Sequence, residues 1–245
     1  MRSLAYAIRT LTRLAVGSGA LEKEEQSLFW FPLVGALYGA VATLIALLPL
    51  PEAVIAALII ASWAYLNRAF HLDGLADLAD GLGGGWNAER SLTIMRDSHI
   101  GAFGTIALII ALLMQYAALS SLTSDPLALL IAPLFGRAMI VVAAGLLPYA
   151  REGEGSASKL VRGAKIHHVI VVGVQLLLIA LLCWFIVGLP GMQRVALSLA
   201  FAIVFTGLVL RVAKKRLGGV TGDVLGAVAV IAESAALVGF LIPLA

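Results

Sequence analysis

The chain has 245 residues, of which 61% are hydrophobic and 13% are charged, and its formal net charge is +3. Soluble domains are about half apolar and about a quarter charged, so this balance excludes an ordinary soluble fold and indicates a lipid environment. The single cysteine, Cys183, excludes an intramolecular disulfide framework and a thiolate metal cluster. We expect no cleavable signal peptide, because residues 1–27 lack a continuous apolar core.

The first element in chain order is a short amphipathic segment, residues 1–14. Leu4, Ile8 and Leu11 recur at helical spacing, and three arginines share another face. This pattern predicts a short helix that lies at the membrane interface. A frayed terminus that carries basic residues is the alternative.

Long apolar segments follow, and a run of roughly 20 apolar residues is enough to span the hydrocarbon core of a bilayer. We predict one all-α membrane domain, residues 1–245, with about seven transmembrane helices. Small residues in these segments permit close helix packing, including between copies of the chain in a homo-oligomer. The predicted spans are 28–49, 53–70, 102–122, 127–148, 168–188, 195–213 and 220–243.

The basic residues predict the orientation of these spans, because cytoplasmic loops are rich in Lys and Arg. If the spans alternate, nearly all basic residues outside the apolar runs fall on one side, and Arg194 is the exception. The N-terminus is therefore predicted to be cytosolic and the C-terminus to lie outside. The residues on the cytosolic side are Arg2, Arg9, Arg13, Lys23, Arg90, Arg96, Arg151, Lys159, Arg162, Lys165, Arg211, Lys214, Lys215 and Arg216.

The segment 71–100, between the second and third spans, is polar and rich in glycine and aspartate. Asp73, Asp77 and Asp80 are spaced i, i+4 and i+7, which places them on one face of a helix. Like charges in this arrangement repel each other unless a cation compensates them. Oxygen ligands favour magnesium or manganese, so we predict a divalent-metal site. The alternative is that the aspartates form the solvated end of a membrane helix.

A second cluster follows at Met95–His99. Asp97 supplies a fourth carboxylate, and Arg96 is a cation that can clamp a phosphate. The glycines between 81 and 85 are expected to form a flexible turn that folds the two clusters onto each other.

Three further charged positions lie in or near the apolar runs. Glu233 falls in the middle of the last span and Arg137 in the middle of the fourth, so we predict a buried ion pair or a polar cavity between them. Asp223, near the cytosolic end of the last span, is expected to join the metal site, hold a substrate hydroxyl or serve the structure alone. Arg151 begins a basic segment that suits either an anionic nucleotide or the anionic membrane surface.

These motifs together resemble the cobalamin synthase family, adenosylcobinamide-GDP ribazoletransferase. The resemblance covers nearly the whole chain, although residues 14–27 depart from the family pattern. It is carried by Phe70–Gly81, Ile94–Ser98 and Gly101, with further matches at Phe31–Gly35, Gly136–Arg137, Tyr149–Glu152, Leu217–Asp223 and Glu233.

The resemblance implies a magnesium-dependent enzyme of the bacterial cytoplasmic membrane, whose active site faces the cytosol. Its substrates are adenosylcobinamide-GDP and α-ribazole or α-ribazole 5′-phosphate, and its products are adenosylcobalamin, or the 5′-phosphate, and GMP. Asp73, Asp77 and Asp80 are the expected metal ligands, and Asp97 is a further ligand or the base.

Asp73, Asp77 and Asp97 are thus the expected catalytic residues. Arg96 and Arg151 are expected to contact phosphate. The remaining charged positions, Asp223, Arg137 and Glu233, are expected to surround the substrate.

Two other functions are compatible with the residues. One is a CDP-alcohol phosphotransferase that makes a phospholipid, although the aspartate pairs of that family are separated by a longer gap. The other is a cation transporter, which would distribute carboxylates at midplane depth over several spans. Beyond its substrates the expected partner is the lipid bilayer, and no nucleic acid is expected.

Overall fold

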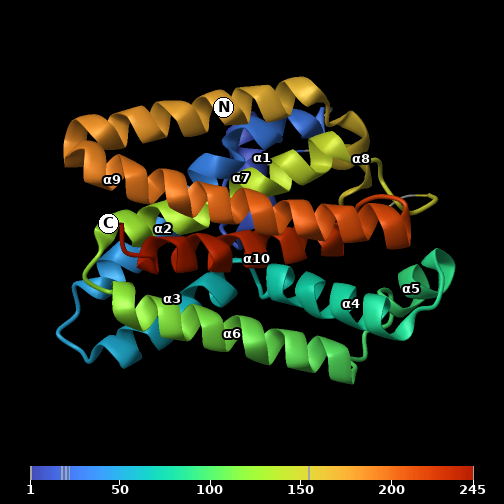
Figure 1. Cartoon of the computed structure of the whole chain (residues 1–245). Helices are drawn as coiled ribbons and strands as arrows, with labels where there is room; N and C mark the ends of the chain where they lie inside the picture. The colour runs from blue at the N-terminus through green and yellow to red at the C-terminus, as the bar shows by residue number, and fades with distance from the viewer. Residues whose placement is uncertain (1, 18, 20, 22, 154, 245) are drawn as a thin grey trace.

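The computed structural model describes residues 2–244 except for positions 18, 20, 22 and 154 (Figure 1). The regular elements within this part of the chain are helices, which confirms the predicted all-α class. They are α1 (Arg2–Leu11), η1 (Glu24–Trp30), α2 (Phe31–Ala46), α3 (Glu52–Leu66), α4 (Phe70–Gly84), α5 (Ala88–Ile94), α6 (Ala102–Leu122), α7 (Pro126–Leu146), α8 (Ser158–Gly163), α9 (Ile166–Leu217) and α10 (Gly222–Leu241).

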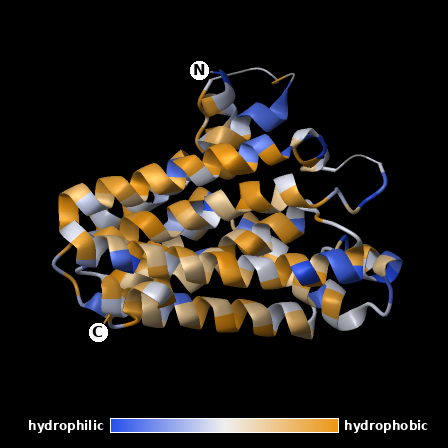
Figure 2. Cartoon of the chain, turned by 45° about the horizontal axis from the view of Figure 1, so that its top comes forward, coloured by the Kyte–Doolittle hydropathy of each residue, from blue (hydrophilic) through white to orange (hydrophobic). Residues whose placement is uncertain are grey.

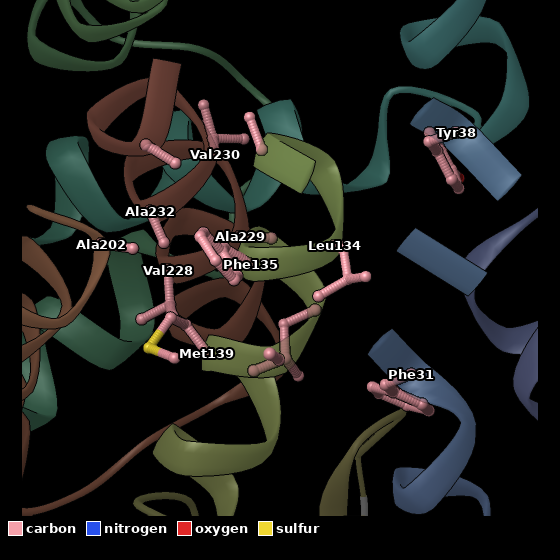
Figure 3. Close-up of a cluster of buried hydrophobic side chains, with 14 of the residues drawn as sticks. Phe31, Tyr38, Leu134, Phe135, Met139, Ala202, Val228, Ala229, Val230 and Ala232 are labelled. Carbon is pink, nitrogen blue, oxygen red and sulfur yellow. The ribbon is translucent and has the colours of Figure 1, made fainter. Parts of the chain in front are cut away.

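Helices α7 and α10 form the centre of the bundle, and most of their residues are buried. Figure 3 shows Phe135 and Met139 of α7 packed among small side chains of α10, with α2 on the other side of α7. Glycines bring these helices close together. A Cβ atom on Gly35 of α2 would lie 2.5 Å from the Cα of Leu134, so a larger residue there would separate α2 from α7.

The outer surface of the bundle is apolar. Helices α6 and α9 expose many large hydrophobic side chains, as expected where lipid is the solvent. Figure 2 shows hydrophobic residues along the long helices, with hydrophilic residues gathered mainly at one end of the bundle and around α1. Five of the described helices are long and apolar enough to cross a membrane, or six if α3 and α4 are taken as one bent span. The chain is a polytopic membrane protein.

Helix α9 contains two of the predicted spans, 168–188 and 195–213. Its two arms meet at Gly188, whose φ of 71° and ψ of −173° are not helical, and the chain turns back on itself there (Figure 1). Glycine adopts this positive φ without strain, and Pro190 suits the first turn of the second arm. Counted separately, and with α3 and α4 as one span, the arms bring the spans to the predicted seven.

The second predicted span, 53–70, ends earlier than expected. Helix α3 has 15 residues, or about 22 Å, which is shorter than the ~30 Å hydrocarbon core. Arg68 and Ala69 then take positive φ values of 57°, and α4 leaves at an angle of 87° to α3. The aspartates therefore lie on a helix packed against α10 and α6, as their spacing predicted.

The predicted N-terminal helix is confirmed as α1. It is tied to the bundle at its C-terminal end, where the carbonyl of Leu11 accepts a hydrogen bond from the hydroxyl of Tyr38. The backbone amide of Arg13 also donates to the carbonyl of Leu66, 2.7 Å away. Helix α1 consequently covers the region where α3 ends and α4 begins.

Candidate functional site

Helix α4 carries the three aspartates at the predicted helical spacing, but they do not share one environment. Asp73 is exposed and Asp77 is half-buried, and both line a cavity of about 490 Å³. Asp80 is buried and does not line this cavity. We call the space beside Asp73 and Asp77 the aspartate cavity.

The opposite wall of the aspartate cavity is the segment between α5 and α6. It contributes Met95, Arg96, Asp97 and Ser98, so the two clusters predicted to fold together do meet. The close approach depends on glycine, because a Cβ atom on Gly81 would lie 3.0 Å from the sulfur of Met95. A carboxylate-lined wall thus faces a wall that carries both a carboxylate and a guanidinium.

Asp97 forms a local pair with His99. Its Oδ1 atom lies 2.7 Å from His99 Nδ1 and accepts a hydrogen bond from the His99 amide at 3.0 Å. These hydrogen bonds, the side-chain one first, hold the pKa of Asp97 below its ordinary value. A carboxylate that holds its proton weakly suits a metal ligand better than a general base.

Asp80 caps the N-terminus of α6. Its two oxygens accept hydrogen bonds from the amides of Gly101 at 2.7 Å and Gly104 at 2.8 Å. Glycine is needed at this contact, because a Cβ atom on Gly101 would lie 2.5 Å from Asp80 Oδ1. The charge also complements the positive end of the helix dipole, so Asp80 joins α4 to α6.

Arg151 and Asp223 form an ion pair at the edge of the site, with 2.7 Å between Nη2 and Oδ2. The isolated bridge between Tyr149 and Val220 holds the two segments together. Arg151 also donates to the carbonyl of Met95 at 3.4 Å, and its buried Nε has no hydrogen-bond partner among the described residues. Arg151 and Asp223 are both among the charged groups that act on Asp77. The charges of the pair therefore act on the carboxylates of the aspartate cavity.

Helices α4 and α10 touch beside this pair. A Cβ atom on Gly74 would lie 2.7 Å from the carbonyl oxygen of Asp223, so the aspartate helix presses directly on the backbone of α10. This contact sets Asp73 and Asp223 at the same level of the bundle.

The predicted ion pair between Arg137 and Glu233 is confirmed. Glu233 also accepts a hydrogen bond from Gln115 at 3.1 Å, and the guanidinium of Arg137 lies 4.0 Å from the centre of the Tyr38 ring. The space beside the pair is a cavity of about 20 Å³, which has room for a water molecule but not for a substrate. The structure encloses both residues within the bundle, away from the aspartate cavity.

Some contacts of the site were not predicted from the sequence. Arg216 donates to the carbonyls of Leu82 and Gly85, at 3.2 and 2.6 Å, and so binds the C-terminal end of α4. From the sequence, Arg216 was used only to predict the orientation of the spans. Gln115, a polar residue within an apolar run, was the available signal for a further partner of Glu233.

A metal site made of protein ligands alone is not formed by the described residues, since no three of their His, Cys, Asp or Glu side chains are placed to hold an ion. Magnesium does not require such a cage. It usually keeps several waters and binds one or two carboxylates together with substrate phosphates. Asp73 and Asp77, which line the cavity from successive turns of α4, fit this type of binding.

Fold and site together define a class: an integral membrane protein whose bundle holds an acidic helix against an arginine-bearing turn. The chain belongs to the cobalamin-5-phosphate synthase family, whose model matches residues 3–241. The family resemblance of the sequence is thereby confirmed.

Curated relatives named adenosylcobinamide-GDP ribazoletransferase match over almost their whole length. The relative from Prosthecochloris aestuarii is 39% identical over 94% of both chains. The relative from Chlorobium phaeovibrioides is 38% identical over 95% of this chain and 94% of its own. The relative from Pseudomonas fluorescens is 38% identical over 98% of both. No solved structure matches the chain.

Proposed function

We propose that the chain is an adenosylcobinamide-GDP ribazoletransferase of the bacterial cytoplasmic membrane. It joins adenosylcobinamide-GDP to α-ribazole or α-ribazole 5′-phosphate and releases GMP. The observation that carries this proposal is the aspartate cavity, where Asp73, Asp77, Arg96 and Asp97 converge in a chain that matches the family almost from end to end.

The reaction is a transfer at phosphorus. With α-ribazole, the 5′-oxygen forms a bond to the phosphorus that carries adenosylcobinamide, and the bond from this phosphorus to the bridging oxygen of the diphosphate breaks. GMP leaves with that oxygen, and the proton of the hydroxyl passes to a base. Such transfers ask the protein for positioning and charge stabilisation rather than for a covalent nucleophile.

The residues of the site divide this work. Asp73 and Asp77 would hold magnesium, with Asp97 as a further ligand, and the ion would neutralise charge on the diphosphate. Arg96 lies across the aspartate cavity from them and would contact the phosphate oxygens. Arg151, oriented by Asp223 and by the carbonyl of Met95, would contact the same group through its guanidinium. The basic residues that predict the orientation of the spans support a cytosolic position for this site.

The test is magnesium-dependent release of GMP from adenosylcobinamide-GDP by the purified chain in lipid nanodiscs. Asp73→Asn should lower the rate at least about 100-fold, because it weakens the site that compensates the charge of the diphosphate. Glu52→Gln, an exposed change at the start of α3, is the matched control and should leave the rate unchanged. Asp73→Asn activity within about threefold of wild type contradicts the role of Asp73. Release of CMP from a CDP-alcohol instead of GMP contradicts the reaction.

A further inference from the structure

A second cavity, of about 170 Å³, lies beneath α1. Its floor is made of buried side chains, including Leu11, Phe31 and Leu225. Its mouth is marked by Thr10 and Ser156, which are exposed. The cavity is therefore closed on the side of the bundle and open between α1 and the segment that precedes α8. We call it the α1 cavity.

The lining of the α1 cavity combines aromatic rings with a small number of polar groups. Tyr6, Phe31 and Phe70 supply the rings, and Glu24 supplies a half-buried carboxylate. Burial, followed by the neighbouring Glu24, raises the pKa of Tyr6 to about 12, so its phenol stays neutral. Sites for small molecules have this mixture, in which apolar walls hold the ligand and a few polar groups orient it.

Such a lining suits a nucleoside. Aromatic side chains stack on the faces of heterocyclic bases. An acidic side chain binds ribose hydroxyls, as in dinucleotide-binding folds. The absence of basic residues from the described lining also favours a neutral sugar and base over a diphosphate.

The α1 cavity and the aspartate cavity both border α4. Phe70 and His71 line the α1 cavity, whereas Asp73 and Asp77 line the aspartate cavity. Helix α4 is thus a wall common to both spaces.

The Arg151–Asp223 ion pair lies between residues that line the two cavities. Gly222, next to Asp223 in sequence, lines the α1 cavity. Met95, whose carbonyl accepts a hydrogen bond from Arg151, lines the aspartate cavity. The pair therefore lies next to residues of both cavities.

We propose that the α1 cavity binds the acceptor nucleoside, with its base among the aromatic rings and its ribose at Glu24. The inference rests on the proposed function, in which two substrates meet at one phosphorus. In phosphoryl transfer the attacking and leaving oxygens lie roughly in line on opposite sides of the phosphorus. The diphosphate of the activated corrinoid would occupy the aspartate cavity, and the nucleoside would approach it beside the Arg151–Asp223 ion pair.

The experiment measures binding of α-ribazole to the full chain in nanodiscs by calorimetry, without corrinoid. The same titration is repeated on Asp73→Asn protein with adenosylcobinamide-GDP present. Thr10→Trp, which fills the mouth, and Glu24→Gln, which removes the charge of the ribose acceptor and replaces one of its oxygens by a donor, should each weaken binding about tenfold or more. The control Glu52→Gln should bind as wild type does.

Titration with the free base of α-ribazole separates contacts to the base from contacts to the ribose. The free base lacks the ribose, so Glu24→Gln should leave its affinity unchanged while Thr10→Trp weakens it. Unchanged α-ribazole binding in both variants, with or without corrinoid, overturns the assignment of the α1 cavity. If GMP release is normal in that case, the proposed function stands, whereas a wild-type chain that never releases GMP contradicts the function itself.

Discussion

Helix α10 supplies the acid of two arginine–carboxylate pairs in the bundle. Arg137 and Glu233 lie in the sealed centre, with side chains 2% and 6% exposed. Arg151 and Asp223 lie at the edge of the site, with side chains 15% and 19% exposed. The sequence suggested contact with substrate for all four residues. The two pairs differ in access, because the first lines a space for a single water, whereas residues next to the second line the aspartate cavity and the α1 cavity.

The comparison predicts that the central pair acts on stability. Glu233→Leu leaves Arg137 charged and unpaired in the bundle, which should lower the free energy of unfolding by about 3–5 kcal/mol. Unfolding of the purified protein in mixed micelles measures this loss. The double variant Arg137→Met/Glu233→Leu removes both charges and should recover most of it. A double variant as unstable as the single one contradicts the comparison.

The edge pair should act on the reaction instead. Asp223→Asn removes the charge that orients Arg151, and we expect GMP release to fall about 100-fold while the unfolding temperature stays near that of wild type. The rate of Arg151→Lys should fall by a similar amount, since an ammonium lacks the planar set of N–H donors that a guanidinium presents to phosphate. If either variant unfolds as readily as Glu233→Leu while the folded fraction remains fully active, the two pairs do not differ as proposed.

Asp80 and Asp73 test the same distinction between a role in stability and a role in the reaction, because both lie on α4. Asp80→Asn keeps one acceptor for the α6 amides but loses the charge at the helix N-terminus, which should cost about 1 kcal/mol of stability. Binding of Mn²⁺, followed by electron paramagnetic resonance, should persist in Asp80→Asn and be lost in Asp73→Asn. Loss of Mn²⁺ binding in Asp80→Asn, with stability unchanged, would instead make Asp80 a metal ligand.

The smallest effect is expected at the exposed pair of Asp97 and His99. His99 holds the pKa of Asp97 below its ordinary value, so the carboxylate stays ionised to lower pH than it otherwise would. His99→Ala should let this pKa rise, and the acidic limb of the pH–rate profile should then move to higher pH. His99→Asn is a control of similar polarity. An acidic limb that does not move in His99→Ala excludes Asp97 from the groups that control the rate.

Periodicity in the sequence was enough to predict the helix that carries the aspartates and most of the spans. Spacing of i, i+4 and i+7 places residues on one helical face whatever surrounds them. It could not predict that Asp80 turns to the amides of Gly101 and Gly104, because that contact depends on where α6 begins in space.

The end of α3 was missed for a related reason. The break at Asn67–Ala69 contains neither glycine nor proline, and the positive φ values fall on Arg68 and Ala69, so neither of the strongest local signals marked it. The α1 cavity could not be predicted from the sequence, because elements far apart in the chain form its walls. They are α1, η1, α2, α4, α7 and α10, with the segment around α8.

The separation of Arg137 and Glu233 by 96 positions has a consequence for how the protein is made. During synthesis α7 is produced long before α10, so Arg137 reaches the bilayer while its acid has not yet been translated. An arginine at the centre of a lone helix costs about 2.5–3.5 kcal/mol on insertion scales. We therefore expect α7 to stay at the translocon or against α2 until α10 arrives, and chains that stop short of Glu233 to be degraded.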